Sequence, residues 1–161
     1  RSGLQLARRI RNDIVEKHAA AWIYWQFADG GGWGLVNNRL DGRDPRFRLT
    51  RKFHVMAQFS RFIRPGFRIV ATSDGDSLAA YDAAKKQLII VDVNDSYNSR
   101  TVIFNLSGIF TSTTKVISHR TSQQEDVAEL SPLDLADGKF TADLPARSVT
   151  TFTVADALLA P

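Results

Sequence analysis

Two stretches of the chain carry hydrophobic residues at helical spacing. Residues 2–17 place one apolar stripe opposite a basic face, as in an amphipathic helix. Residues 50–63 predict a second helix, which the Arg-Pro-Gly sequence at 64–66 stops. The stripe of the first helix consists of Leu6, Ile10 and Ile14, flanked by Leu4, Ala7 and Val15. The second helix has Phe53, Met56, Ala57, Ser60 and Ile63 on its apolar face, with Arg51, Lys52, Gln58 and Arg61 elsewhere.

A short aromatic run, residues 21–27, separates the two helices. It has no helical periodicity, and the glycine cluster at 30–32 cannot continue a strand, so we predict a strand that enters a loop. Residues 37–45 form a polar, turn-rich loop with Asp41-Gly42 and Asp44-Pro45. The order of helix, strand, long loop and helix is how an eight-fold β/α barrel would finish.

From residue 67 onward the hydrophobic period changes to about two. Short segments rich in β-branched residues alternate with turn signals, which predicts an antiparallel β-sandwich over residues 67–154. Residues 121–140 have a weaker pattern, with a strand at 125–130 and a turn at Asp137-Gly138. The predicted strands are 67–72, 77–83, 87–93, 101–106, 113–119 and 148–154.

These patterns predict an α+β fragment with two domains. Residues 1–66 would be the last helix, strand and helix of a (β/α)8 TIM barrel, and residues 67–161 a β-sandwich side domain. A single strand cannot cover the first helix, and the chain starts at Arg1 without a methionine. We therefore expect upstream sequence that supplies the rest of the barrel.

Composition narrows the function classes. The 161 residues are 43% hydrophobic and 24% charged, as in a soluble globular protein, and no apolar run is long enough to cross a membrane or to form a signal peptide core. There is no cysteine, so disulfides and thiolate metal sites are excluded. The first 68 residues hold 14 basic and 5 acidic side chains. Clusters such as Arg8, Arg9 and Arg11 could contact phosphate, but without a nucleic-acid motif a solvated helix face or the rim of a larger assembly is favoured.

Candidate chemistry is concentrated in residues 21–36, which contain all three tryptophans. Trp25 and Gln26 would place a stacking ring and a bidentate amide at the strand-to-loop junction, where an α/β barrel builds its active site. Such a pair suits a sugar, whereas Trp22 fits the core equally well. Asp29 is the one acid of this region expected near a sugar.

Other chemistries have weaker support. His18, His54 and His119 are scattered without the spacing of a metal site, so we expect neither a metal nor a cofactor. The glycine run lacks the lysine and hydroxyl residue of a phosphate-binding loop and is interpreted as a flexible rim. Asp13 and Glu16 lie on the polar helix face, and Asp41 and Asp44 have turn-forming neighbours.

A resemblance joins the two halves. The sequence QFSRFIRPG at 58–66, with YWQ at 24–26, GWGL at 32–35 and LPARSVTTF at 144–152, resembles the C-terminal part of glycoside hydrolase family 30. The YWQ and GGWGL patterns are most similar to endo-β-1,6-galactanase-type members, followed by glucuronoxylanase and β-1,6-glucanase types. The resemblance implies that residues 21–27 are barrel strand eight and residues 50–63 helix eight.

The same resemblance implies a retaining glycosidase that acts on a β-linked polysaccharide and is secreted. Its acid/base glutamate follows strand four and its nucleophilic glutamate lies on strand seven, so both would precede Arg1. The isolated chain is therefore expected to be inactive. Trp25 would border the sugar, Gln26 or Tyr24 would bind hydroxyl groups, and Trp33 would form a subsite wall or plug the barrel mouth.

We expect a polysaccharide substrate and an N-terminal barrel segment as partners, and no nucleic acid or membrane. The alternative is a non-catalytic carbohydrate-binding or structural β-sandwich module. Against carbohydrate binding by the sandwich, residues 67–161 contain no tryptophan and few tyrosines, Tyr81 and Tyr97, although sugar platforms favour exposed aromatic rings.

Overall fold

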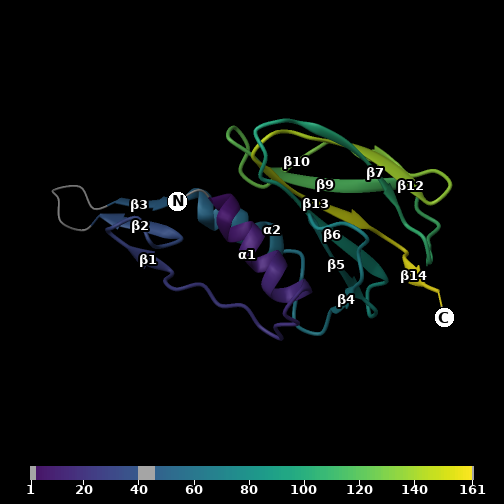
Figure 1. The fold of residues 1–161 in the computed structure, drawn as a ribbon, viewed down its shortest axis with the longest axis horizontal. Helices are drawn as coiled ribbons and strands as arrows, with labels where there is room; N and C mark the ends of the chain where they lie inside the picture. The colour runs from purple at the N-terminus through teal and green to yellow at the C-terminus, as the bar shows by residue number, and fades with distance from the viewer. Residues whose placement is uncertain (1–2, 40–45, 161) are drawn as a thin grey trace.

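The computed structural model describes residues 3–39 and 46–160 (Figure 1). Two helices, α1 (Gly3–Val15) and α2 (Arg51–Ser60), pack against each other. They lie between a small N-terminal sheet and a much larger sheet (Figure 1). The N-terminal sheet joins β1 (Ala28–Asp29) in parallel to β2 (Val36–Arg39), which pairs antiparallel with β3 (Arg46–Leu49).

The remaining strand pairs are antiparallel and come from residues 68–159. The large sheet has the order β10-β9-β13-β6-β5-β4, with β11 also pairing with β9, and two smaller pairs, β12-β7 and β14-β8, complete the set. The strands of the large sheet are β4 (Arg68–Val70), β5 (Ser77–Asp82), β6 (Gln87–Asn94), β9 (Lys115–Thr121), β10 (Ala128–Glu129), β11 (Leu133–Asp134) and β13 (Ser148–Val154). The other strands are β7 (Arg100–Asn105), β8 (Ile109–Phe110), β12 (Lys139–Leu144) and β14 (Leu158–Leu159).

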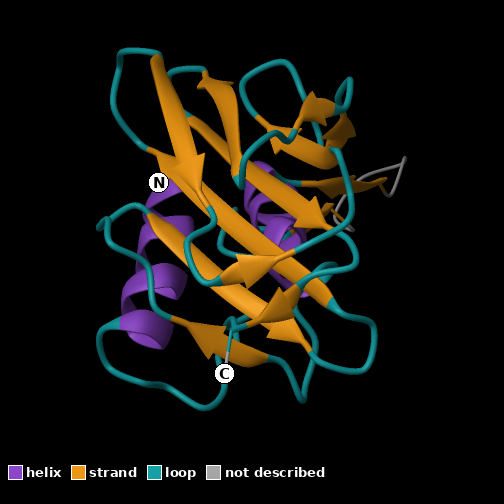
Figure 2. Ribbon diagram, turned by 90° about the vertical axis from the view of Figure 1, so that its right-hand side faces the viewer, coloured by secondary structure: helices purple, strands orange, loops and turns teal. Residues whose placement is uncertain are grey.

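Hydrophobic clusters form on both sides of the large sheet. The helices cover one face (Figure 2), where Ile10, Val55 and Phe59 pack with Leu78 and Val91 of the sheet. The second cluster joins residues of the large sheet to β7 and β12, and its rings Phe104, Phe140 and Phe152 have centroids 4.7–5.1 Å apart. Because both faces are covered, β6 and β13 are buried along almost their whole length.

One polar side chain fixes α2 to the large sheet. Gln58 is completely buried, and its amide group bridges Thr121 of β9 and Thr151 of β13. Its amide oxygen accepts from the Thr121 backbone N–H at 2.9 Å, and its nitrogen donates to the Thr151 hydroxyl group. The predicted face of α2 is therefore wrong. The buried residues of this helix are Val55, Gln58 and Phe59, whereas the residues of the predicted apolar face are only half-buried: Phe53, Met56, Ala57, Ser60 and Ile63.

Arginine side chains fix α1 to the same sheet. Arg11 is only 4% exposed and donates to the backbone oxygens of Ser77 and Asp74, both at 3.0 Å. Arg8 forms ion pairs with Asp76 at 2.7 Å and Asp95 at 2.9 Å. The prediction of a solvated face is wrong for both arginines, because the loops after β4 and β6 supply oxygen atoms that replace water.

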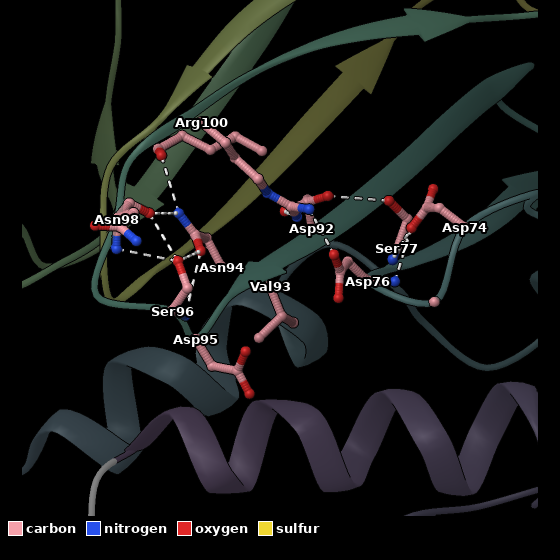
Figure 3. Close-up of polar contacts among 12 residues, drawn as sticks. Asp74, Asp76, Ser77, Asp92, Val93, Asn94, Asp95, Ser96, Asn98 and Arg100 are labelled. Carbon is pink, nitrogen blue, oxygen red and sulfur yellow. Dashed lines mark hydrogen bonds and ion pairs between the residues drawn. The ribbon is translucent and has the colours of Figure 1, made fainter.

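Arg100 extends this ion-pair network into the protein, where it contacts Asp76 and, at 2.7 Å, Asp92 (Figure 3). Burial raises the pKa of Asp92 despite the nearby Arg100 charge. Burial alone would also raise the pKa of Asp76. The hydrogen bonds and charges of Arg8 and Arg100 outweigh this effect, so the net result is a lowered pKa. The pKa of Asp95 is lowered chiefly by its hydrogen bond from Arg8.

The predicted elements mostly recur in order. Both helices are confirmed, and the six predicted sandwich-region strands correspond to β4, β5, β6, β7, β9 and β13. The predicted 125–130 strand shortens to β10, and the predicted turn at Asp137-Gly138 connects β11 and β12 with positive φ at both residues. Among residues 67–160, four strands were not predicted: β8, β11, β12 and β14.

Two predictions near the N-terminus change. The predicted strand over 21–27 is not formed in this chain, because the segment has no partner strand among the described residues. Only Gln26 and Phe27 accept backbone bonds, from Leu35 and Val36. The first residues of the predicted 37–45 loop, 37–39, belong to β2, which pairs antiparallel with β3 directly after the loop. Its predicted turns, with Asp41 and Asp44, lie outside the described residues.

Gly34 is required where the chain returns from the glycine-rich loop to β2. A Cβ atom at this position would lie 2.7 Å from both the Asp29 backbone nitrogen and the Val36 oxygen. Both neighbours are backbone atoms, so the contact cannot be relieved by a side-chain rotation. Gly30, in the same loop, would bring a Cβ atom no closer than 3.6 Å to the Asn38 oxygen.

We predict that Arg8→Ala lowers the free energy of unfolding by about 1–2 kcal/mol at pH 7, since two partly exposed ion pairs are lost. The pKa values of Asp76 and Asp95 are lowered in the folded protein. Their ion pairs with Arg8 therefore add to the free energy of unfolding above the ordinary aspartate pKa, and this stabilisation is lost as pH falls through the lowered values. Urea unfolding of both proteins should therefore show a difference that shrinks below about pH 4. Asp92 does not contact Arg8, so its raised pKa affects both proteins alike. A difference independent of pH would contradict this account.

We predict that Gly34→Ala destabilises the protein by about 1–3 kcal/mol, because the new methyl group overlaps backbone atoms. Gly30→Ala is the matched control and should change stability by less than about 0.5 kcal/mol. Thermal unfolding monitored by circular dichroism measures both. Equal stability of the two variants would show that the chain returns to β2 by another path.

Candidate functional site

The aromatic segment 22–27 has two different faces although it is not a hydrogen-bonded strand. Ile23, Trp25 and Phe27 are 89%, 84% and 65% exposed, whereas the alternate side chains are half-buried. Trp22 donates its indole N–H to Asp13 of α1 at 3.0 Å and stacks on the Tyr24 ring, with centroids 6.2 Å apart. Trp22 and Tyr24 pack against the helices, so Trp25 faces away from them.

The Asp29 carboxylate holds the glycine-rich loop that follows it. It accepts hydrogen bonds from the backbone N–H groups of Gly31 at 2.6 Å and Trp33 at 3.2 Å, and from Gln26 Nε2 at 3.1 Å. Partial burial alone would raise the pKa of Asp29. Hydrogen bonds from Gln26 and the loop backbone outweigh this effect, so the net result is a lowered pKa. The loop is thus held by specific contacts, in place of the flexible rim expected from its glycines.

Lys52, in the first turn of α2, holds the same loop from the other side. Its ammonium group donates to the backbone oxygens of Gly32 at 2.7 Å and Trp33 at 2.6 Å. It also lies 5.6 Å from the centroid of the Tyr24 ring, and the Tyr24 hydroxyl donates to the Trp33 oxygen at 2.7 Å. Sequence patterns placed Lys52 on a polar helix face, and nothing in them indicated this contact across the chain.

A hollow of about 1210 Å³ lies between the aromatic segment, the glycine-rich loop and α1. Three of the predicted site residues line it, Tyr24, Trp25 and Trp33, together with the cationic side chains of Arg9 and Lys52. Its aromatic rings can stack on a flat ligand, and its cations can donate hydrogen bonds to ligand oxygens. The other two predicted residues, Gln26 and Asp29, support the loop that carries Trp33.

The described acidic residues of the N-terminal region are engaged in other contacts. Asp13 accepts from Trp22 and Lys17, Glu16 pairs with Arg11, and Asp29 binds its own loop. Among residues 3–39 and 46–160, no cluster of histidine, cysteine and acidic side chains could hold a metal ion. None of the helices in this part of the protein is long and apolar enough to cross a membrane.

Curated relatives share sequence along almost the whole chain. It is 32% identical over 163 residues to an endo-β-1,6-galactanase of Hypocrea rufa, an alignment that covers 98% of this chain and 34% of that enzyme. It is 30% identical over 155 residues to glucuronoxylanase XynC of Bacillus subtilis strain 168, covering 94% of this chain and 34% of the enzyme. The chain thus spans about a third of the length of these relatives. No protein-family model matches it.

The fold is also similar to a solved structure. The chain superposes on a glycoside hydrolase family 30 subfamily 8 xylanase, Xyn30A, of Clostridium acetobutylicum with a TM-score of 0.79 and 28% sequence identity. This match covers 95% of the chain and 38% of the xylanase. Taken together with the curated relatives, it shows that the chain belongs with glycoside hydrolase family 30-like enzymes, of which it represents the C-terminal part.

Proposed function

We propose that this chain completes the catalytic region of a retaining endo-glycoside hydrolase that cleaves a β-linked polysaccharide. β-1,6-Galactan is favoured as the substrate, because the galactanase shares slightly more identity over slightly more of the chain than the glucuronoxylanase does. Glucuronoxylan and β-1,6-glucan are the alternatives. As an enzyme of this class acts on external polysaccharides, we also propose that the protein is secreted.

In this proposal residues 1–66 complete a (β/α)8 barrel and residues 67–161 form its β-sandwich side domain. The two faces of the aromatic segment support this arrangement. In a barrel strand, alternate side chains face the surrounding helices and the barrel interior. Trp22 and Tyr24 pack on the helices, so Ile23, Trp25 and Phe27 have the orientation of interior residues. Further strands of the barrel would cover the rest of this exposed face.

The exposure of Trp25 is the observation that carries the proposal. Trp25 is 84% exposed and lines a hollow whose wall also includes Trp33. The CH groups of one sugar face can pack on the Trp25 ring, while Trp33 bounds the same subsite. Tyr24, Gln26 and Asp29 would support substrate binding without touching the sugar, because they hold the loop that positions Trp33.

The catalytic carboxyl groups would come from the N-terminal barrel segment, which is the proposed partner of this chain. Retention requires two carboxyl groups about 5–5.5 Å apart, one as nucleophile and one as general acid and then base. The engagement of Asp13, Glu16 and Asp29 in structural contacts agrees with this division. Residues 1–161 alone should therefore bind sugar without hydrolysing it.

We predict that Trp25→Ala in the intact enzyme lowers kcat/KM on its polysaccharide roughly tenfold or more, because a stacking surface beside the scissile bond is lost. Trp25→Phe should retain part of the activity, since a smaller ring remains. Trp22→Phe is the control on the opposite face: it removes the bond to Asp13 and should lower thermal stability while leaving kcat/KM nearly unchanged.

The kinetic assay should use β-1,6-galactan, glucuronoxylan and β-1,6-glucan in parallel. Cleavage of one of them with retention of anomeric configuration is the expected result. An intact protein that cleaves none of these polysaccharides, or a Trp25→Ala variant with wild-type kinetics, would contradict the proposal.

A further inference from the structure

The loop between β6 and β7 is built to hold one conformation. Asn94 is buried, and its amide nitrogen donates to the backbone oxygens of Asn98 and Leu144, both at 3.0 Å. Its amide oxygen accepts from the Ser96 backbone N–H at 3.3 Å and from the Ser96 hydroxyl at 2.8 Å (Figure 3). The Ser96 hydroxyl in turn accepts from the Asn98 N–H at 3.1 Å. This framework fixes the backbone on both sides of residue 97.

The side chain that this loop presents is Tyr97, which is 84% exposed. The guanidinium carbon of Arg147 lies 5.0 Å from the centroid of its ring. Arg147 is held in turn, because it donates from Nη1 to the Asp95 oxygen at 2.8 Å and from its backbone to the Ser96 oxygen at 3.1 Å. Arg147 also has a φ of 58°, a strained conformation that the surrounding contacts maintain.

Tyr81, the other tyrosine of residues 67–161, has the contacts expected of a ring that stabilises the fold. Tyr81 is half-buried against the second hydrophobic cluster, and its hydroxyl donates to the Ala157 oxygen at 2.9 Å. Tyr97 is outside both hydrophobic clusters. Packing of the core therefore does not explain why a fixed loop displays this ring to solvent.

Tyr97 lies at the same end of the molecule as the Trp33 loop. Arg147 lines a cavity of about 190 Å³ together with Gly3 and Arg51, which begin α1 and α2. The neighbouring residue Lys52 holds the Trp33 loop. Asp95 of the Tyr97 loop lines the large hollow that also contains Trp33. The Tyr97 loop and the Trp33 loop thus border the same hollow, through Asp95 and Trp33.

We propose that Tyr97 and Arg147 form a second sugar-binding site on the side domain, which holds a pyranose unit of the same β-linked polysaccharide away from the point of cleavage. The open face of the Tyr97 ring would pack on the CH face of the sugar, while the Arg147 guanidinium supports the ring from its other face. Because the loop backbone and the Arg147 guanidinium are already held by hydrogen bonds, little of their conformational entropy is lost on binding. The inference rests on the proposed function for the identity of the polysaccharide.

Affinity electrophoresis of the 161-residue chain in gels containing β-1,6-galactan or glucuronoxylan tests this site. A Trp25→Ala/Trp33→Ala variant removes the rings of the hollow, and we expect at least one polysaccharide still to retard it. Adding Tyr97→Ala should weaken this remaining binding roughly fivefold or more, whereas adding Tyr97→Phe should preserve it, because the ring remains. Thermal unfolding checks that Tyr97→Ala leaves the fold intact, as expected for an exposed ring.

Free migration of the Trp25→Ala/Trp33→Ala variant in every gel would overturn the second site. Equal retardation of this variant with and without Tyr97→Ala would also overturn it. Neither result affects the proposed hydrolase activity, which is tested separately by the kinetics of Trp25 variants in the intact enzyme. Conversely, retention of the Tyr97 effect in an enzyme that cleaves no β-linked polysaccharide would contradict the proposed function alone.

Discussion

The attachment of one face of the aromatic segment to the helices is the constraint on which the site depends. Trp22 bonds to α1 through Asp13, and Tyr24 lies beneath Lys52 of α2, so neither ring can turn toward solvent without losing these contacts. Because successive side chains of an extended chain point to opposite sides, Trp25 then lies on the opposite face of the segment. The glycine-rich loop follows from the same anchoring, because Lys52 and Tyr24 both bind the Trp33 oxygen.

The helices can serve as this anchor because they are themselves fixed to the large sheet. Hydrophobic packing buries most of the contact area between the helices and the sheet, but hydrogen bonds and ion pairs fix where each helix lies. Gln58 binds β9 and β13, and Arg8 and Arg11 bind the loops after β4 and β6. The loop after β6, which receives Arg8 through Asp95, also carries Tyr97. Residues 68–160 therefore do more than cover the helices, since one of their loops extends the end of the molecule at which we propose that the sugar binds.

The sequence predicted those features that arise from local periodicity. Both helices and six strands follow from apolar spacing, and Trp25 was selected as a candidate because aromatic rings clustered before a glycine run. Long-range contacts were missed: Gln58 and Arg11 have polar side chains, and only the position of a distant strand makes them core residues. The strand Lys139–Leu144 alternates buried and exposed residues over only six positions, so its pattern was hidden in a weak region. The segment 21–27 forms no strand in this chain, because strand formation requires a neighbouring strand.

The most direct test of the account is an experimental structure of the intact enzyme with an oligosaccharide of its substrate bound. We predict that the Trp25 ring lies against a sugar unit, with Trp33 bounding the same subsite and the Trp22 and Tyr24 rings still packed on the two helices. A structure in which the Trp25 ring is covered by protein and the sugar binds on another face of the molecule would contradict the account.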